Sequence, residues 1–287
     1  MDNNPTPGQS VRVRLSLVLT LLVLFAVVFF SGVGVGIHQR SPISVPIVGN
    51  VTLETKTENY PQLYRSKGTT YTLSTSRRSF FALDNSGNLI LKNSLPYQAE
   101  RIYRFDRTIN PNSAAIVIMD PWIDMPSEFL NEYHGKVLES RTIPLVKHAL
   151  ALGHPIITFT NNPSTTKYST KIHPELQALV EDGKASLFYH QDFDDDDFAQ
   201  YLHSEGIDSL IYAGFDSNWC LIGRMTGMVY MANQGFKIFF VPGASAAVEF
   251  GDSWQDQSIH KATTTIVSQW IAELIDYDEF MQISASK

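Results

Sequence analysis

The sequence predicts an α/β domain, a three-layer sandwich in which helices cover both faces of a mainly parallel sheet. From residue 113 onward, short and wholly apolar runs alternate with longer segments of helical periodicity. A continuous apolar run is typical of a strand buried on both faces, and alternation of strands with helices indicates right-handed βαβ units. The chain has 287 residues, 44% of them hydrophobic, which is enough for one such core with an appendage.

Five strands and five helices are predicted in this part of the chain. The strands are expected at 114–119, 155–160, 185–189, 209–213 and 237–241. The helices are expected at 136–152, 174–181, 195–205, 219–234 and 260–275, the first three ended by Gly153, Gly183 and Gly206. In an open parallel sheet a site forms beyond the carboxyl ends of the strands, so functional residues are expected at that edge.

A membrane-spanning helix is predicted at 15–37, after a short disordered tail at 1–14. These 23 residues carry no charge, and at about 1.5 Å per residue they would cross a hydrocarbon core of about 30 Å. Two arginines precede the run and one follows it, which favours a single-pass protein with its bulk on the extracytoplasmic side. The alternative to this signal anchor is a cleaved signal peptide, because small residues at 31–34 follow the apolar stretch.

A small β-rich extension is predicted at 38–110, before the α/β domain at 111–287. Strand-forming residues occur at 69–73, 80–83 and 89–91, and the turn residues of 84–87 separate the last two runs. A turn of this composition between two apolar runs favours a hairpin.

Charge and cysteine content exclude several classes of function. With 22 basic and 29 acidic residues the formal net charge is −7, which argues against a nucleic-acid partner because nucleic-acid-binding surfaces are basic. Cys220 is the only cysteine, so neither a disulfide within the chain nor a zinc site of several thiolates can form.

Two residues lie where a parallel sheet would place reactive groups. Asp120 directly follows the first buried strand, and Cys220 opens a predicted helix after the loop 214–219. A helix N-terminus stabilises a thiolate, and a carboxylate from a neighbouring strand can accept the thiol proton. The alternative is that Cys220 is an inert buried residue and Asp120 only caps a helix.

Three segments of the chain resemble the isochorismatase-like cysteine hydrolases. Residues 116–125 resemble the strand that ends in this family's catalytic aspartate, with a second acid, Asp124, four positions later. Residues 206–220 resemble the approach to its nucleophile, and 141–160 fit its first helix and second strand. The resemblance covers about 111–275 and implies a Rossmann-like sheet.

This resemblance implies a set of roles for residues of the chain. Cys220 would attack a carbonyl carbon, and Asp120 would act as general base. Backbone N–H groups at Cys220 and near a non-proline cis peptide at Phe215–Asp216 would stabilise the oxyanion. Asp216, Trp122 and Trp219 are the residues expected to line the oxyanion and substrate region.

The chain departs from the family pattern in two places. At the end of the third strand, where the family has a catalytic lysine, this sequence has no lysine, and His190 is the nearest residue that aligns. As an imidazolium, His190 could support a thiolate. The metal-dependent nicotinamidases of the family use an Asp and a His after the second strand, where this chain has Asn161-Asn162-Pro163. We therefore expect no metal and no cofactor.

Two functions remain open at this point. The first is a membrane-anchored cysteine hydrolase of a small amide, carbamoyl or related substrate, with Asp120, His190 and Cys220 as catalytic residues. The second is a catalytically inactive domain that serves as a membrane-tethered binding or assembly subunit. The resemblance also implies a possible homo-oligomer.

Overall fold

The computed structural model describes residues 60–79, 81–88, 101–193 and 196–284. The predicted tail at 1–14 and the predicted membrane helix at 15–37 lie outside the described residues. None of the helices in the described ranges is long and apolar enough to cross a membrane.

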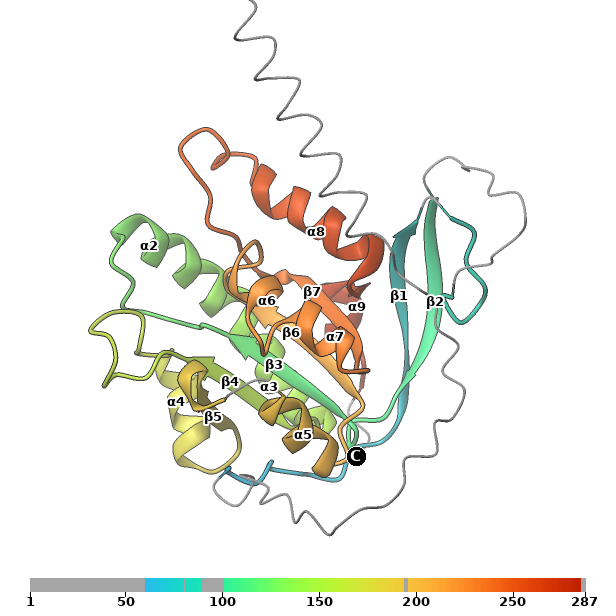
Figure 1. Cartoon of the computed structure of the whole chain (residues 1–287), viewed down its shortest axis with the longest axis horizontal. Helices are drawn as coiled ribbons and strands as arrows, with labels where there is room; N and C mark the ends of the chain where they lie inside the picture. The colour runs from blue at the N-terminus through green and yellow to red at the C-terminus, as the bar shows by residue number, and fades with distance from the viewer. Residues whose placement is uncertain (1–59, 80, 89–100, 194–195, 285–287) are drawn as a thin grey trace, which may run out of the picture. The chain divides into compact units, whose positions relative to one another are not determined.

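One eight-stranded sheet, with the order β2-β1-β8-β7-β6-β3-β4-β5, organises the described chain (Figure 1). Six neighbouring strands, β8, β7, β6, β3, β4 and β5, run parallel to one another. In contrast, β1 is antiparallel to both β2 and β8. The strands are β1 (Tyr71–Ser79), β2 (Arg101–Ile109), β3 (Ala114–Met119), β4 (Ile156–Thr160), β5 (Ser186–Tyr189), β6 (Ser209–Gly214), β7 (Lys237–Ser245) and β8 (Glu273–Ile275).

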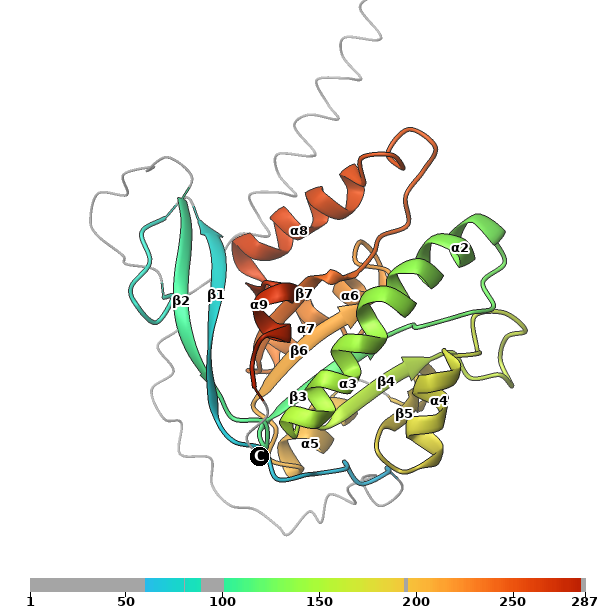
Figure 2. The same ribbon diagram turned by 180° about the vertical axis from the view of Figure 1, so that it is seen from behind.

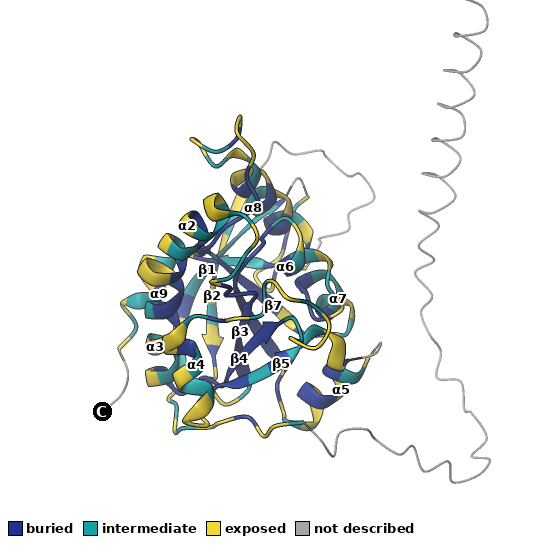
Figure 3. Ribbon diagram, turned by 90° about the vertical axis from the view of Figure 1, so that its left-hand side faces the viewer, coloured by how far each residue is buried: buried dark blue, intermediate teal, exposed yellow. Residues whose placement is uncertain are grey.

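Helices cover both faces of the sheet, as predicted. On one face (Figure 2) lie α2 (Glu128–Val137), the π-helix η2 (Leu138–Thr142), α3 (Ile143–Leu152), α4 (Pro174–Glu181) and α9 (Tyr277–Met281). On the other lie α5 (Asp197–Ser204), α6 (Cys220–Gly223), α7 (Met228–Asn233) and the C-terminal part of α8 (Ser258–Trp270). All six residues of β3 are buried, and Figure 3 shows the central strands in the colour of buried residues. The sheet therefore forms the centre of two apolar layers.

The five predicted strands are confirmed, but three predicted helices differ. Helical structure begins at Glu128 rather than 136, because the Ser127 hydroxyl accepts a hydrogen bond from the Leu130 N–H and caps α2. The helix predicted at 219–234 is split into α6 and α7, since Arg224 has an extended backbone that ends α6. The helix predicted at 260–275 ends at Trp270, and β8 follows it.

The described part of the predicted β-rich extension continues the main sheet instead of packing on it as an appendage. β1 pairs with β2 along its whole length and with β8 at Thr75 and Ser76. A half-buried ion pair between Arg107 and Glu273, with 2.6 Å between Nη2 and Oε1, ties β2 to β8. The turn predicted at 84–87 is present, with the Gly87 N–H donating to Asp84 O, whereas the strand predicted at 89–91 lies outside the described residues.

Gly214 allows β6 to approach β3 at the edge where the site forms. Its φ is +108°, and a Cβ atom at this position would lie 2.3 Å from the backbone oxygen of Met119. We expect Gly214→Ala to lower the free energy of unfolding by at least about 3 kcal/mol, because strain at a positive φ adds to a backbone clash. Urea denaturation measures the loss. Gly235→Ala is the matched control, since its φ is +92° but nothing lies within 4 Å of the added Cβ; equal losses for both variants would contradict the role of the close approach.

Candidate functional site

Asp120 lies at the carboxyl end of the central strand β3, and its side chain is fully buried. Its φ is +50°, a left-handed conformation that non-glycine residues rarely adopt. The backbone is held there on both sides, because the Asp120 N–H donates to Phe159 O and the Trp122 N–H donates to Asp120 O. Such strain persists only where the surroundings impose it, and it is typical of functional sites.

His190 follows β5 and pairs with Asp120. The distance between His190 Nε2 and Asp120 Oδ1 is 2.5 Å, and both side chains are buried. The imidazole also stacks on Phe159 with an interplanar angle of 9°. His190 is thus placed to orient the carboxylate of Asp120, and its hydrogen bond is made to that acid.

Cys220 opens α6, after the end of β6, and its thiol interacts with both Asp120 and Arg224. The second oxygen of Asp120, Oδ2, is buried without a hydrogen-bond partner, and Arg224 Nη2 lies 4.0 Å from it. Groups that follow β3, β5 and β6 therefore meet at the carboxylate of Asp120.

The electrostatics of this cluster keep the thiol protonated in the resting protein. Burial, and then the charge and contact of Asp120, raise the pKa of Cys220 to about 12, against the opposing effect of Arg224. The α6 helix adds little, because with four residues it is one turn long and has almost no macrodipole. The predicted stabilisation of a thiolate by the helix end stays a prediction, and a proton acceptor beside the sulfur is needed because burial raises the pKa of the thiol.

Asp216 lies on the far side of a non-proline cis peptide bond, Phe215–Asp216, which is where the resemblance predicts one. Its buried carboxyl has Oδ1 3.2 Å from His134 Nε2, and the His134 ring stacks on Phe215. Burial, and then the charge of Asp120, raise the pKa of Asp216 to about 7. Burial also lowers the pKa of His134 to about 4. The raised pKa favours a protonated Asp216, and a neutral carboxyl group does not repel an oxyanion beside it.

The two tryptophans predicted at the site have different environments. Trp122 is buried, and its Nε1–H donates to Thr160 Oγ1 at 2.9 Å, so it braces the loops after β3 and β4. Trp219, directly before Cys220, is 59% exposed. Asp124 accepts hydrogen bonds from the backbone of Thr170 and Lys171 and holds the same two loops together.

Arg224 is the site residue that the sequence analysis missed. It is four residues after Cys220, a spacing that places two side chains on one face of a helix and that could have revealed it. Arg224 is in fact the C-cap residue of α6 and has an extended backbone. Its side chain interacts with the thiol of Cys220 and lies close to Asp120. It supplies a positive charge beside the thiol of Cys220 and the carboxylate of Asp120.

Comparisons with known proteins find similar chains among solved structures. No protein among the curated sequences matches the chain. Among solved structures it is similar to YcaC from Escherichia coli, described as an octameric hydrolase of unknown specificity (20% identity, TM-score 0.44, covering 60% of this chain and 79% of that one). A cysteine hydrolase from Pseudomonas syringae is similar at 16% identity and a TM-score of 0.46, over 61% of this chain and 93% of that one. A nicotinamidase from Staphylococcus aureus is similar at 14% identity and a TM-score of 0.39, over 57% and 97% of the two chains.

A family profile gives the decisive match. The profile of the isochorismatase domain matches residues 114–276, from the first residue of β3 to just beyond β8. This span is more than half of the chain, and it contains Asp120, His190, Cys220 and Arg224. By this match the chain belongs to the isochorismatase family of hydrolase-like proteins.

Proposed function

We propose that this protein is a cysteine hydrolase that cleaves the C–N bond of a small amide or carbamoyl compound, with Cys220 as nucleophile and Asp120 as general base. The observation that carries the proposal is the meeting of a thiol, a buried carboxylate and an arginine at one edge of the sheet, with His190 2.5 Å from the carboxylate. A thiol paired with a base oriented by a third group is the arrangement that nucleophilic catalysis requires.

In the first half-reaction Asp120 removes the thiol proton while Cys220 Sγ attacks the substrate carbonyl carbon. The negative charge that leaves the sulfur passes to the carbonyl oxygen, where the Cys220 N–H at the start of α6 is positioned to donate a hydrogen bond. When the C–N bond breaks, the amine leaves with the proton that Asp120 received. The products are a thioester at Cys220, a free amine and an ionised Asp120.

In the second half-reaction Asp120 takes a proton from water, and the hydroxide attacks the thioester. Breakage of the C–S bond releases the carboxylic acid, and Asp120 returns its proton to the sulfur. Arg224 stabilises the sulfur anion each time it forms, since its charge lowers the pKa of the thiol. His190 acts through Asp120, by holding Oδ1 so that Oδ2 faces the thiol.

The direct test is ammonia release from a panel of small primary amides and N-carbamoyl compounds by the purified full chain. We expect at least one member to be cleaved, with cleavage abolished in Cys220→Ser and the thioester trapped by hydroxylamine as the hydroxamate. Absence of cleavage, together with alkylation of Cys220 by iodoacetamide only in denaturant, would instead support the second candidate, a catalytically inactive binding or assembly subunit. That candidate is favoured by one observation, the absence of the family's lysine at His190.

Arg224→Gln should slow alkylation of Cys220, because it removes the charge that lowers the pKa of the thiol. The side chain is 33% exposed, so solvent weakens its effect, and we expect a loss of roughly threefold to tenfold in the rate at pH 8. Mass spectrometry of the iodoacetamide adduct in samples quenched at successive times measures this alkylation rate. Arg224→Lys should restore most of the rate. Equal rates for wild type and Arg224→Gln would remove this residue from the site.

We further propose that residues 15–37 anchor the protein in a membrane, with the catalytic domain on the extracytoplasmic side and a small molecule as its substrate. The support is the uncharged run of 23 residues and the arginines that flank it. Extraction of the full chain by alkaline carbonate without detergent would contradict the anchor. The prediction of a homo-oligomer stays a prediction.

A further inference from the structure

Residues 215–219 form the loop between β6 and α6 that leads to Cys220, the nucleophile loop. Its backbone is bonded to the segment after β7, where the Ser217 N–H donates to Ala246 O at 2.8 Å. Ser217 is fully buried, so its hydroxyl has no solvent to bond and requires a partner within the protein. The position of Cys220 therefore depends on the groups that hold this loop.

The partner of the Ser217 hydroxyl is His260, in the first turn of α8. Ser217 Oγ lies 2.9 Å from His260 Nδ1, and His260 Nε2 lies 3.2 Å from Pro242 O. A carbonyl oxygen only accepts, so Nε2 carries the proton of the neutral ring, and Nδ1 then accepts from the hydroxyl of Ser217. Burial lowers the pKa of His260, which favours this neutral form. The hydrogen bond therefore runs from Ser217 to His260 and requires one tautomer of the ring.

A buried acid fixes the backbone of His260. The carboxylate of Glu249, which is 3% exposed, accepts from the N–H groups of His260 and Ile259 at 2.8 and 3.3 Å. Both N–H groups belong to the first turn of α8, where a helix has no acceptors of its own, so Glu249 caps the helix. Since Glu249 follows β7 and Pro242 lies in it, the same part of the chain holds the backbone and the ring of His260.

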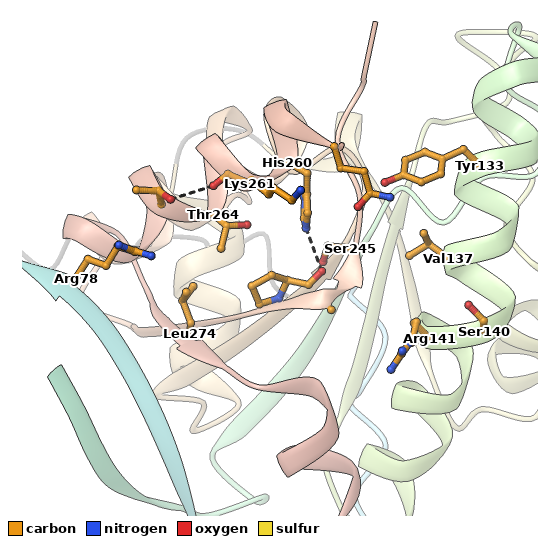
Figure 4. A pocket seen from close by; sticks show the side chains of 14 residues that line it. Arg78, Tyr133, Val137, Ser140, Arg141, Ser245, His260, Lys261, Thr264 and Leu274 are labelled. Carbon is orange, nitrogen blue, oxygen red and sulfur yellow. Dashed lines mark hydrogen bonds between the residues drawn. The ribbon is translucent and has the colours of Figure 1, made fainter. Parts of the chain in front are cut away.

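The imidazole of His260 also borders a cavity of about 670 Å³ between α8, the π-helix η2 and the end of β7. In Figure 4 His260 points from α8 toward the end of β7, with Tyr133 of α2 and Arg141 of η2 across the space. The lining of this cavity does not include Cys220. A smaller side chain at position 260 opens onto space that already exists, so we expect variants at this position to fold.

We propose that His260 is a positioning residue of the hydrolase: through the Ser217 hydroxyl it holds the nucleophile loop so that the thiol of Cys220 faces Asp120. This role rests on the proposed hydrolase function, but the hydrogen bond that carries it lies outside the catalytic groups. Without the acceptor at Nδ1, the buried hydroxyl loses its partner, which favours a shift of the loop toward water. The thiol then moves away from its base.

Alkylation of Cys220 by iodoacetamide at pH 8 reports the position of the thiol without any substrate. Burial and the charge of Asp120 raise the pKa of this thiol, so a thiol that moves away from them should react faster. We expect Ser217→Ala and His260→Leu each to raise the alkylation rate of the full chain by roughly threefold to tenfold. The double variant should show no further increase, because both changes remove the same hydrogen bond.

Turnover should change in the opposite direction. For an amide that the wild type cleaves, kcat should fall by roughly tenfold in Ser217→Ala and in His260→Leu, because a small displacement of the nucleophile lowers the rate of attack. KM should stay nearly the same, since neither side chain is expected to contact the substrate.

His260→Asn separates positioning from a merely structural role. The Asn Oδ1 atom can take the place of Nδ1 and accept from Ser217, so the alkylation rate and kcat should return close to those of the wild type. Ser268→Ala is the matched control, because Ser268 is fully buried on the same helix and its hydroxyl donates to Thr265 O within that helix. Its rates should equal those of the wild type.

Three results would overturn the proposal. They are unchanged alkylation in Ser217→Ala and His260→Leu when thermal unfolding shows both to be folded, equal rates for His260→Asn and His260→Leu, and a double variant in which the two single increases multiply. A wild-type protein that cleaves no amide would count against the hydrolase function instead, and the alkylation rates would still test whether His260 holds the loop.

Discussion

Asp120→Asn will abolish hydrolysis and yet make Cys220 easier to alkylate. Loss of the general base removes the acceptor of the thiol proton, and we expect turnover to fall by roughly 10²–10⁴-fold. The same change removes the carboxylate whose charge and contact raise the pKa of the thiol. A larger thiolate fraction then reacts with iodoacetamide at pH 8, so the alkylation rate should rise.

The opposite direction of these two effects separates catalysis from simple exposure of the thiol. Parallel measurement of ammonia release and adduct formation follows both. A fall in both rates would indicate that the variant has disturbed the site, and a rise in alkylation with unchanged turnover would exclude Asp120 as the base. His190→Gln is the matched control: it loses the partner of Oδ1 but keeps the base, so turnover should fall less than in Asp120→Asn.

In Asp216→Asn the free energy of unfolding will rise steeply with pH between about 4 and 6.5, where that of the wild type stays nearly level. Two buried groups cause opposite slopes in the wild type. The folded pKa of Asp216 is raised from 3.8 to about 7, so the folded state retains a proton that the unfolded state loses, and stability falls as pH rises through this window. The folded pKa of His134 is lowered from 6.5 to about 4, so the unfolded state binds a proton that the folded state does not, and stability rises with pH.

Removing Asp216 leaves only the slope from His134, which is about 1.4 kcal/mol per pH unit. Over the window the difference in unfolding free energy between variant and wild type should therefore change by about 3 kcal/mol. Urea denaturation at pH 4, 5.5 and 7 measures it, and the reciprocal variant His134→Gln should show a falling slope. The exposed Asp252 provides the control, since Asp252→Asn should follow the wild type. A difference that does not vary with pH would show that the carboxyl of Asp216 is ionised throughout.

Much of the fold follows from local sequence patterns. The apolar runs at β3 and β6 predicted strands buried on both faces, because a side chain in the middle of a parallel sheet has no polar surroundings on either side. Helix ends were predictable where a glycine stands after the last turn, as at Gly153 with its φ of +98°. The short strand β8 was not predictable, since three residues in a helix-like stretch form a strand only through pairing with β7 and β1.

By itself the sequence determined that Asp120 directly follows a buried strand and that Cys220 follows the loop after another, since a buried strand and the residues after it form a local pattern. Only the tertiary structure decided what surrounds the sulfur. His190 pairs with Oδ1 of the acid, Arg224 at the end of α6 interacts with the thiol, and Oδ2 of Asp120 lies 4.0 Å from Arg224 without a hydrogen-bond partner. The physical reason is that a pKa and a hydrogen bond depend on burial and on distances of a few ångströms between residues up to about a hundred positions apart, which no local pattern records.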